Sequence, residues 1–159
     1  MQRDPGPACI ALGANLGDAP ATLRWAMQRL GALPGTRLLR SSRLYRTAPV
    51  DAAGPDFINA VVLLETCSTA PDLLAQLLAL EQLAGRERPY RNAPRTLDLD
   101  LLLFGDARID SPALTVPHPR MAARAFVLVP LAEVLPQAVP ARALAAVGDQ
   151  RITPLAEPG

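Results

Sequence analysis

Hydrophobic and polar positions follow two different periods along this chain, one typical of strands and one typical of helices. The apolar run at residues 9–12 ends at Gly13 and predicts a strand that leads into a loop. Between residues 23 and 30, apolar side chains return at helical spacing. We expect an amphipathic helix that begins after Pro20 and ends at Gly31.

The middle of the chain predicts two strands. Residues 37–45 contain Leu, Ser and Arg without a helical period, so we expect a strand that runs into a loop ending at Pro55. Residues 57–66 are rich in β-formers and predict a central strand. Because side chains alternate between the two faces of a strand, Asn59 and Val61 share one face.

A second helix and a further strand follow. Thr69 is the expected N-cap of a helix whose apolar residues continue over 73–84 until Gly85. Residues 85–94 are polar and dense in Arg, which is typical of a loop. Residues 96–104 then return to strand character.

The order of these elements predicts the fold class. Strand, helix, strand, strand, helix and strand in succession favour an α+β, ferredoxin-like βαββαβ sandwich with a mostly antiparallel sheet and helices packed on it. A further helix is expected at residues 122–134, and the tail after Pro136 shows no clear period. The length of 159 residues predicts a single domain, residues 1–159.

Composition and charge exclude several classes of protein. The net charge of +1 argues against a surface that mainly binds nucleic acid or anionic lipid. All 16 basic residues are Arg, so the lysine of a Walker A phosphate loop is missing. No apolar run reaches the roughly 18 residues of a membrane span, and we expect a cytoplasmic protein. Cys9 and Cys67 are far apart, which predicts two reduced thiols.

Two carboxylates two residues apart suggest a metal site. In a strand, Asp98 and Asp100 project from one face while Leu97, Leu99 and Leu101 face the other way. Neighbouring oxygen ligands suit Mg²⁺, which is commonly shared between carboxylates and substrate phosphates. The alternative is a polar strand face in water.

The loop before this acid pair is rich in arginine. Arg86, Arg88, Arg91 and Arg95 lie within ten positions of one another. Guanidinium groups bind phosphate through two parallel hydrogen bonds, so these residues beside a magnesium site predict a clamp for a polyphosphate. The alternative is a solvated loop whose arginines pair with acids.

The single histidine, His118, lies between two prolines that restrict the backbone. Near Arg124 it could donate a hydrogen bond to phosphate, and the alternative is a packed side chain. The sequence contains no Gly-x-Ser-x-Gly motif and no pattern of a covalent nucleophile. We therefore expect the attacking group to belong to the substrate.

Several separated motifs together resemble the 6-hydroxymethyl-7,8-dihydropterin pyrophosphokinase family, also called 2-amino-4-hydroxy-6-hydroxymethyldihydropteridine diphosphokinase. The similarity extends from about residue 10 to residue 136. The motifs are GANLGD at 13–18, SRLYRT at 42–47, FINA at 57–60, Glu81 with the GR pair at 85–86, PRTLDLD at 94–100, and VPHP at 116–119.

The resemblance implies a folate-synthesis enzyme that binds ATP and the pterin in one cleft. The hydroxyl of 6-hydroxymethyl-7,8-dihydropterin would attack the β-phosphorus of ATP and release AMP. Asp98 and Asp100 would hold two Mg²⁺ ions, and Arg86 and Arg95 would stabilise charge on the moving diphosphate. A monomer without nucleic-acid or membrane partners is expected.

The same resemblance assigns the residues that meet each substrate. The nucleotide would contact Glu81, Arg86, Arg88, Arg95, Leu101, Thr115, His118 and Arg124. The pterin would contact Thr47, Ala48, Val50, Phe57, Asn59 and Phe126. An amide offers a donor and an acceptor together, which fits the pterin's pyrimidine edge, and the two Phe rings offer apolar faces.

One departure from the family pattern affects the predicted site. Where most members carry a Trp-Gly pair, this chain has Asn92 and Ala93, so the aromatic lid over the pterin is missing or replaced by Tyr90. This leaves two other hypotheses open. One is a non-catalytic pterin or nucleotide sensor, and the other is an RNA-binding ferredoxin-like module.

Overall fold

The computed structural model describes residues 4–48, 55–86 and 97–155. In chain order, the elements are β1 (Gly6–Ala14), α1 (Ala19–Gly31), β2 (Thr36–Ser41), β3 (Tyr45–Thr47), β4 (Phe57–Thr66), α2 (Ala70–Arg86), β5 (Asp98–Phe104), β6 (Ile109–Asp110), β7 (Thr115–Val116), the 3-10 helix η1 (Met121–Ala123), α3 (Ala125–Val134), the 3-10 helix η2 (Pro136–Ala138), α4 (Ala141–Ala146) and β8 (Thr153–Pro154).

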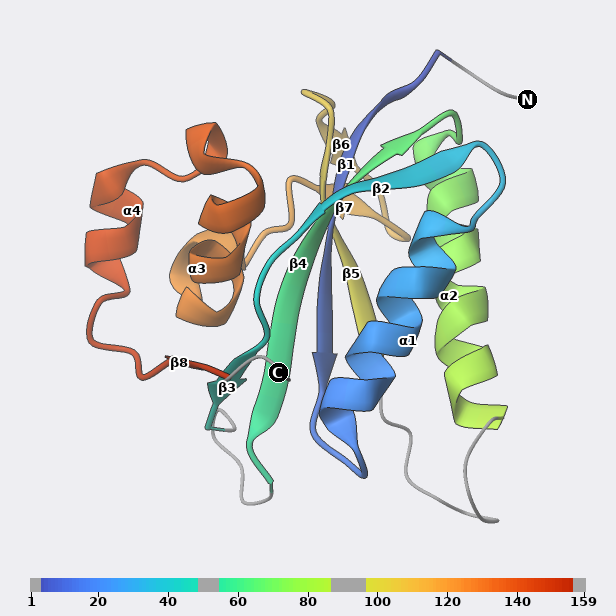
Figure 1. Cartoon of the computed structure of the whole chain (residues 1–159). Coiled ribbons are helices and arrows are strands. Elements are labelled where there is room, and N and C mark those ends of the chain that lie inside the picture. The colour runs from blue at the N-terminus through green and yellow to red at the C-terminus, as the bar shows by residue number, and fades with distance from the viewer. Residues whose placement is uncertain (1–3, 49–54, 87–96, 156–159) are drawn as a thin grey trace.

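The main sheet has six strands in the order β5-β1-β4-β3-β8, with β2 also paired to β4. Its neighbouring strands run antiparallel. Helices α1 and α2 cover one face, and α3 and α4 lie on the other (Figure 1). The fold is therefore mixed α/β, with helices on both sides of an antiparallel sheet. None of the described helices combines the length and the apolar character needed to cross a lipid bilayer.

Alternating side chains of the central strands divide the buried apolar residues into two cores. On β4, Ile58 and Val62 belong to the cluster beneath α1 and α2. Val61 and Leu63 belong to the cluster beneath α3. The predicted period of this strand is confirmed, and Asn59 shares the face of Val61, which faces α3.

Local sequence signals set the starts of the first two helices. Asp18 caps α1, since its Oδ1 accepts a hydrogen bond from Ala21 N at 3.2 Å. Thr69 Oγ1 accepts from Asp72 N at 3.3 Å, which confirms the predicted cap of α2. At the end of β5, Gly105 has φ +56°, a left-handed conformation that favours glycine in the turn.

Two sequence predictions differ from the structure. The strand expected at residues 37–45 is split into β2 and β3, because the pairing with β4 is irregular at Ser42. Ser42 N donates to Val61 O at 2.9 Å, but Val61 N donates to the Ser42 side-chain Oγ at 2.9 Å. The helix expected at residues 122–134 is interrupted at Arg124, which is extended with φ −127° and ψ 115°, so α3 begins only at Ala125. The tail, which showed no clear period, contains α4 and β8.

Candidate functional site

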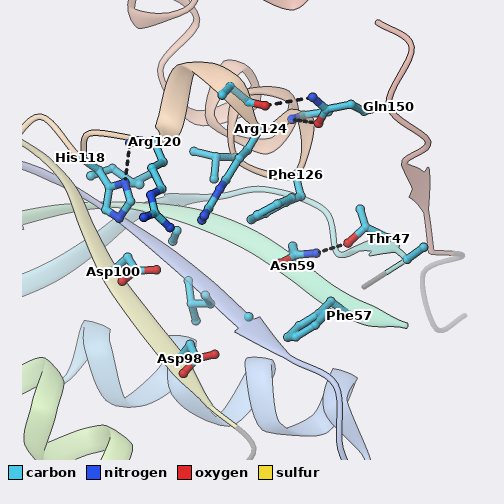
Figure 2. Close-up of a pocket in the computed structure, with 18 of the residues that line it drawn as sticks. Thr47, Phe57, Asn59, Asp98, Asp100, His118, Arg120, Arg124, Phe126 and Gln150 are labelled. Carbon is cyan, nitrogen blue, oxygen red and sulfur yellow. Dashed lines mark hydrogen bonds between the residues drawn. The ribbon is translucent and has the colours of Figure 1, made fainter. Parts of the chain in front are cut away.

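A cavity of about 750 Å³ lies on the α3 side of the sheet. Its floor is formed by β1, β4 and β5, and its walls by segment 118–127, the end of β3 and the tail residues Gln150 and Arg151. Figure 2 shows that charged side chains gather at one end of the cavity, and aromatic and amide side chains at the other. The volume is in the usual range of a small-molecule site.

The acidic part of the charged end comes from β5. Asp98 and Asp100 are exposed and line the cavity, whereas Leu99 and Leu101 are buried on the opposite face. This alternation confirms that the two carboxylates share a face, as the sequence predicted. They are paired in register with Gly13 and Ala11 of β1, small residues that leave the space above the sheet open.

The donor set of this strand fits a hard divalent cation. Two carboxylates on one face of β5 provide oxygen ligands, and the described residues that line the cavity include no sulfur and only one histidine. Oxygen ligands of this kind are what Mg²⁺ prefers. Among the described residues, no group of three or more His, Cys, Asp or Glu side chains is arranged to hold a metal. A cation at Asp98 and Asp100 would therefore need further oxygen ligands from a bound molecule or water.

Basic groups lie across the cavity from the acid pair. Figure 2 shows His118 and Arg120 above Asp100, while Arg124 extends into the cavity from the start of α3. Arg120 N donates to His118 Nδ1 at 3.2 Å, so in neutral His118 the proton is on Nε2, which is then the donor. A polyanion bound between these groups and the carboxylates would meet positive charge on one side.

An irregularity in β5 holds this loop in place. The register with β1 passes from Cys9 opposite Leu103 to Ile10 opposite Leu101, which leaves Leu102 as an extra residue. The carbonyl oxygen of Leu102 accepts a hydrogen bond from His118 N at 3.0 Å. The β-bulge thus holds the loop that contains His118 beside Asp98 and Asp100. Such bulges are common next to active sites.

The opposite end of the cavity combines a buried amide with two aromatic rings. Asn59 is 5% exposed, and its Nδ2 donates to Thr47 Oγ1 at 2.8 Å. In Figure 2, Asn59 lies between the rings of Phe57 and Phe126. A Cβ added at Gly13 would be 3.3 Å from Asn59 Oδ1, so this position of the amide depends on glycine in β1. The arrangement suits a flat, polar-edged ring.

The two ends are linked through Arg124 and Phe126. The guanidinium carbon of Arg124 is 5.3 Å from the centroid of the Phe126 ring, a cation–π distance. One short segment therefore supplies both a positive charge to the charged end and a ring to the other end.

The structure brings together most of the predicted site residues that it describes. The residues that line the cavity are Asp98, Asp100, His118, Arg124, Thr47, Ala48, Phe57, Asn59 and Phe126. Predicted residues that do not line it are Glu81, Leu101 and Thr115. Glu81 is buried and its Oε2 accepts from Leu99 N at 2.8 Å, Leu101 is in the core beneath α1 and α2, and Thr115 is in β7.

The remaining predicted residues lie at the end of a described segment or outside the described residues. Arg86 is the last residue of α2. Val50, Arg88, Arg95 and the substituted lid positions Tyr90 and Asn92 lie outside the described residues.

Sequence reasoning missed three polar residues of the cavity. Arg120 follows His118 by two positions, and this nearness was an available signal. Gln150 and Arg151 reach the cavity from a tail without a recognisable period or motif, so the sequence contained no signal for them.

Comparisons with known proteins show which family the chain resembles. Residues 9–136 match the family model described as 7,8-dihydro-6-hydroxymethylpterin-pyrophosphokinase. A 2-amino-4-hydroxy-6-hydroxymethyldihydropteridine pyrophosphokinase of Synechocystis sp. is 43% identical over 135 residues, which cover 85% of this chain and 69% of that protein. The protein of the same name from Pseudomonas aeruginosa is 47% identical over 128 residues, covering 80% of this chain and 79% of the relative.

Solved structures resemble the fold at much lower identity. Wild-type Plasmodium falciparum HPPK-DHPS with pterin and p-hydroxybenzoate matches with a TM-score of 0.63 and 15% identity, over 86% of this chain. The wild-type protein with pteroate matches with a TM-score of 0.58 and 12% identity, over 86% of this chain. The present chain covers only 39% and 40% of those two chains, so these matches concern the fold alone.

Proposed function

Because the chain belongs to the 7,8-dihydro-6-hydroxymethylpterin-pyrophosphokinase family, we propose that it transfers the terminal diphosphate of ATP to the hydroxymethyl group of 6-hydroxymethyl-7,8-dihydropterin, releasing AMP, in folate biosynthesis. The observation that carries this proposal is a cavity that has both a charged end and an aromatic, amide-bearing end. The two ends match the two chemically different substrates of that reaction.

The architecture is proposed to be ferredoxin-like, within a single domain of residues 1–159. The strand order β5-β1-β4, with β2 and β3 beside β4, and the positions of α1 and α2 support this inference. Segments α3, α4 and β8 then add the wall opposite the two helices (Figure 1). The monomeric state stays a prediction.

Asp98 and Asp100 are proposed to hold Mg²⁺ together with the phosphates of ATP, with two ions at the site. Their exposed carboxylates share one face of β5 and line the charged end of the cavity. When bound, the metal supplies positive charge that offsets the negative charge of the polyphosphate. The role of the protein is to hold these two oxygen ligands on a rigid strand at the floor of the cavity.

Basic side chains are proposed to bind the polyphosphate from the other side. His118 can donate from Nε2, and Arg124 offers a planar guanidinium group for phosphate oxygens. We further propose that Arg86, at the end of α2, and Arg88 and Arg95, which follow it in the sequence, also contribute, as the resemblance implies. Direct contacts of Glu81, Leu101 and Thr115 with the nucleotide stay predictions.

The pterin is proposed to bind at the opposite end, between Phe57 and Phe126. One amide hydrogen of Asn59 is donated to Thr47 Oγ1. Its second amide hydrogen and its Oδ1 then form a donor–acceptor pair that suits the pyrimidine edge of the pterin. Ala48 and Val50 complete the predicted contacts.

The reaction needs no covalent intermediate with the protein. The pterin hydroxyl oxygen forms a bond to the β-phosphorus and releases its proton to solvent or to a phosphate oxygen, while the bond from that phosphorus to the oxygen shared with the α-phosphate breaks and AMP leaves. The protein contributes by aligning the two substrates and by stabilising charge on the transferred group.

The distribution of AMP and ADP tests the function directly. Incubation with ATP, Mg²⁺ and 6-hydroxymethyl-7,8-dihydropterin is expected to give AMP and the pterin diphosphate in equal amounts. ADP as the product would contradict diphosphate transfer. Binding of both ligands without any product would favour the sensor hypothesis, and tight magnesium-independent RNA binding at low salt would favour the RNA-binding module.

A further inference from the structure

The side chain of Gln150 bonds the backbone on both sides of Arg124. Its Oε1 accepts a hydrogen bond from Ala125 N at 2.8 Å, and its Nε2 donates to Ala123 O at 2.9 Å (Figure 2). An N–H group must meet an acceptor and a carbonyl must meet a donor, so only one orientation of the carboxamide satisfies both partners. Gln150 therefore acts as a clip around a single residue of the cavity wall.

The clipped segment is the interruption between η1 and α3. Arg124 is extended, and it precedes the first residue of α3 without providing a side-chain cap of its own. Ala125 N belongs to the first turn of the helix, where backbone N–H groups have no partner inside the helix. Gln150 supplies that missing acceptor from a position 25 residues further along the chain.

Gln150 is itself held by the packing of the tail. Its backbone N donates to Val147 O at 3.0 Å, and Val147 is buried in the core beneath α3. On the other side, β8 pairs with β3, and Leu155 N donates to Leu44 O at 2.9 Å. The tail thus connects the wall that contains Arg124 with the strand that ends at Thr47, at opposite sides of the cavity.

We propose that Gln150 is a positioning residue that sets the direction of the Arg124 side chain into the charged end of the cavity. The residue lies beyond the 9–136 segment that matches the family model. The proposal rests on the proposed function for the identity of the ligand, a magnesium nucleotide. The hydrogen bonds of Gln150 to Ala123 and Ala125 do not depend on that function.

The mechanism follows from the geometry of the clip. With both neighbouring peptide groups bonded, rotation of the backbone at residue 124 is restricted, and the guanidinium group stays near the Phe126 ring. Without the clip, the backbone at residue 124 keeps only its own bonds, from Arg124 N to Met121 O and from Val127 N and Leu128 N to Arg124 O. Its direction is then less tightly fixed, and Arg124 must be ordered further when the nucleotide binds. This ordering weakens binding and misplaces the charge in the transition state.

The test compares Gln150→Leu with Gln137→Leu, a matched change at an exposed glutamine outside the cavity. Leu is close to Gln in size but makes neither hydrogen bond. From the usual strength of two such bonds, we expect Gln150→Leu to lower kcat/KM by roughly 5- to 30-fold, while the control stays within about twofold of the wild type. An unchanged kcat/KM in Gln150→Leu would overturn the proposal.

A double-mutant cycle separates positioning from a general structural effect. If Gln150 acts through Arg124, Gln150→Leu should lower kcat/KM by less than about twofold once Arg124→Ala is present. An equal loss in both backgrounds would show that the effect does not pass through Arg124, and would overturn the proposal. Comparing melting curves of all four proteins establishes that each variant is folded.

Two readouts do not depend on turnover. If the wild type formed no AMP, the proposed function would fail, and the same cycle measured as Kd for magnesium and a non-hydrolysable ATP analogue would still decide the role of Gln150. Hydrogen exchange on the wild type needs no variant at all. The Ala125 amide should exchange slowly for a first-turn position, and exchange at the rate of an unbonded amide would contradict the clip.

Discussion

Replacing Glu81 by Ala is expected to weaken both the fold and the catalytic strand. Glu81 is on α2 and is only 7% exposed, and its Oε2 accepts a hydrogen bond from Leu99 N at 2.8 Å. Leu99 separates Asp98 from Asp100 on β5. The carboxylate therefore supports the strand from the side opposite the cavity.

The size of the effect follows from this contact. A hydrogen bond from a buried backbone N–H to a carboxylate typically contributes about 1.5–3 kcal/mol, and Ala leaves that N–H without its acceptor. We expect Glu81→Ala to lower the free energy of unfolding by about 2–3 kcal/mol, which lowers Tm by about 4–12 °C in a chain of this length. Glu81→Gln keeps an oxygen acceptor, so its loss should be near 1 kcal/mol.

The assay combines thermal unfolding with steady-state kinetics. Measured well below Tm, kcat/KM for Glu81→Ala should fall roughly 10- to 100-fold, because β5 is held less firmly and both aspartates are less well positioned relative to the bound substrates. Gln82→Ala, an exposed neighbour on the same helix, should stay within about 0.5 kcal/mol of the wild type. Wild-type Tm and wild-type activity in Glu81→Ala would refute the supporting role of this hydrogen bond.

Three further predictions concern the cavity and the core. Asp98→Asn and Asp100→Asn should each lower AMP formation about 100-fold or more, with little change in Tm because both side chains are exposed. Near-normal turnover in both variants would rule out the metal assignment. Gly13→Ala should weaken pterin binding more than nucleotide binding, because the added Cβ would lie 3.3 Å from Asn59 Oδ1. Calorimetric titrations that show equal losses of affinity for the pterin and the nucleotide would contradict this prediction. Burial raises the pKa of Cys9 from 9.0 to about 12. The neutral Cys9 thiol therefore contributes fully to stability below pH 9.0, and this contribution is lost as the pH rises toward 12. In native protein at pH 8 the thiol should resist a disulfide reagent that labels it after denaturation, and rapid labelling of the native protein would count against this burial.

Local patterns predicted the elements whose signals are local. The period of residues 57–66 placed Asn59 on the face that the structure turns toward α3, and the alternation in β5 placed Asp98 and Asp100 together. Thr69 was identified as a cap because capping depends on residues three positions apart. These features follow from backbone geometry over a few residues, and no distant partner is needed to produce them.

Features that depend on distant partners were not predicted. The prediction of one helix over residues 122–134 did not include the interruption at Arg124, whose neighbours Ala123 and Ala125 are hydrogen-bonded to the distant side chain of Gln150. The helical period of α2 did not predict the hydrogen bond from Leu99 N to Glu81, because that contact forms only when α2 packs on β5. Arg151 reaches the cavity only through the path of the tail.

The sequence by itself determined α1, α2 and the strands β1, β4 and β5, the shared face of the two aspartates, and a set of motifs specific enough to identify the family. Tertiary structure decided which groups surround those aspartates and how the wall around Arg124 is held. The physical reason is range: periodicity and capping act within one or two turns of the chain, whereas a cavity is formed by side chains from strands, loops and a tail that meet only after the sheet has folded.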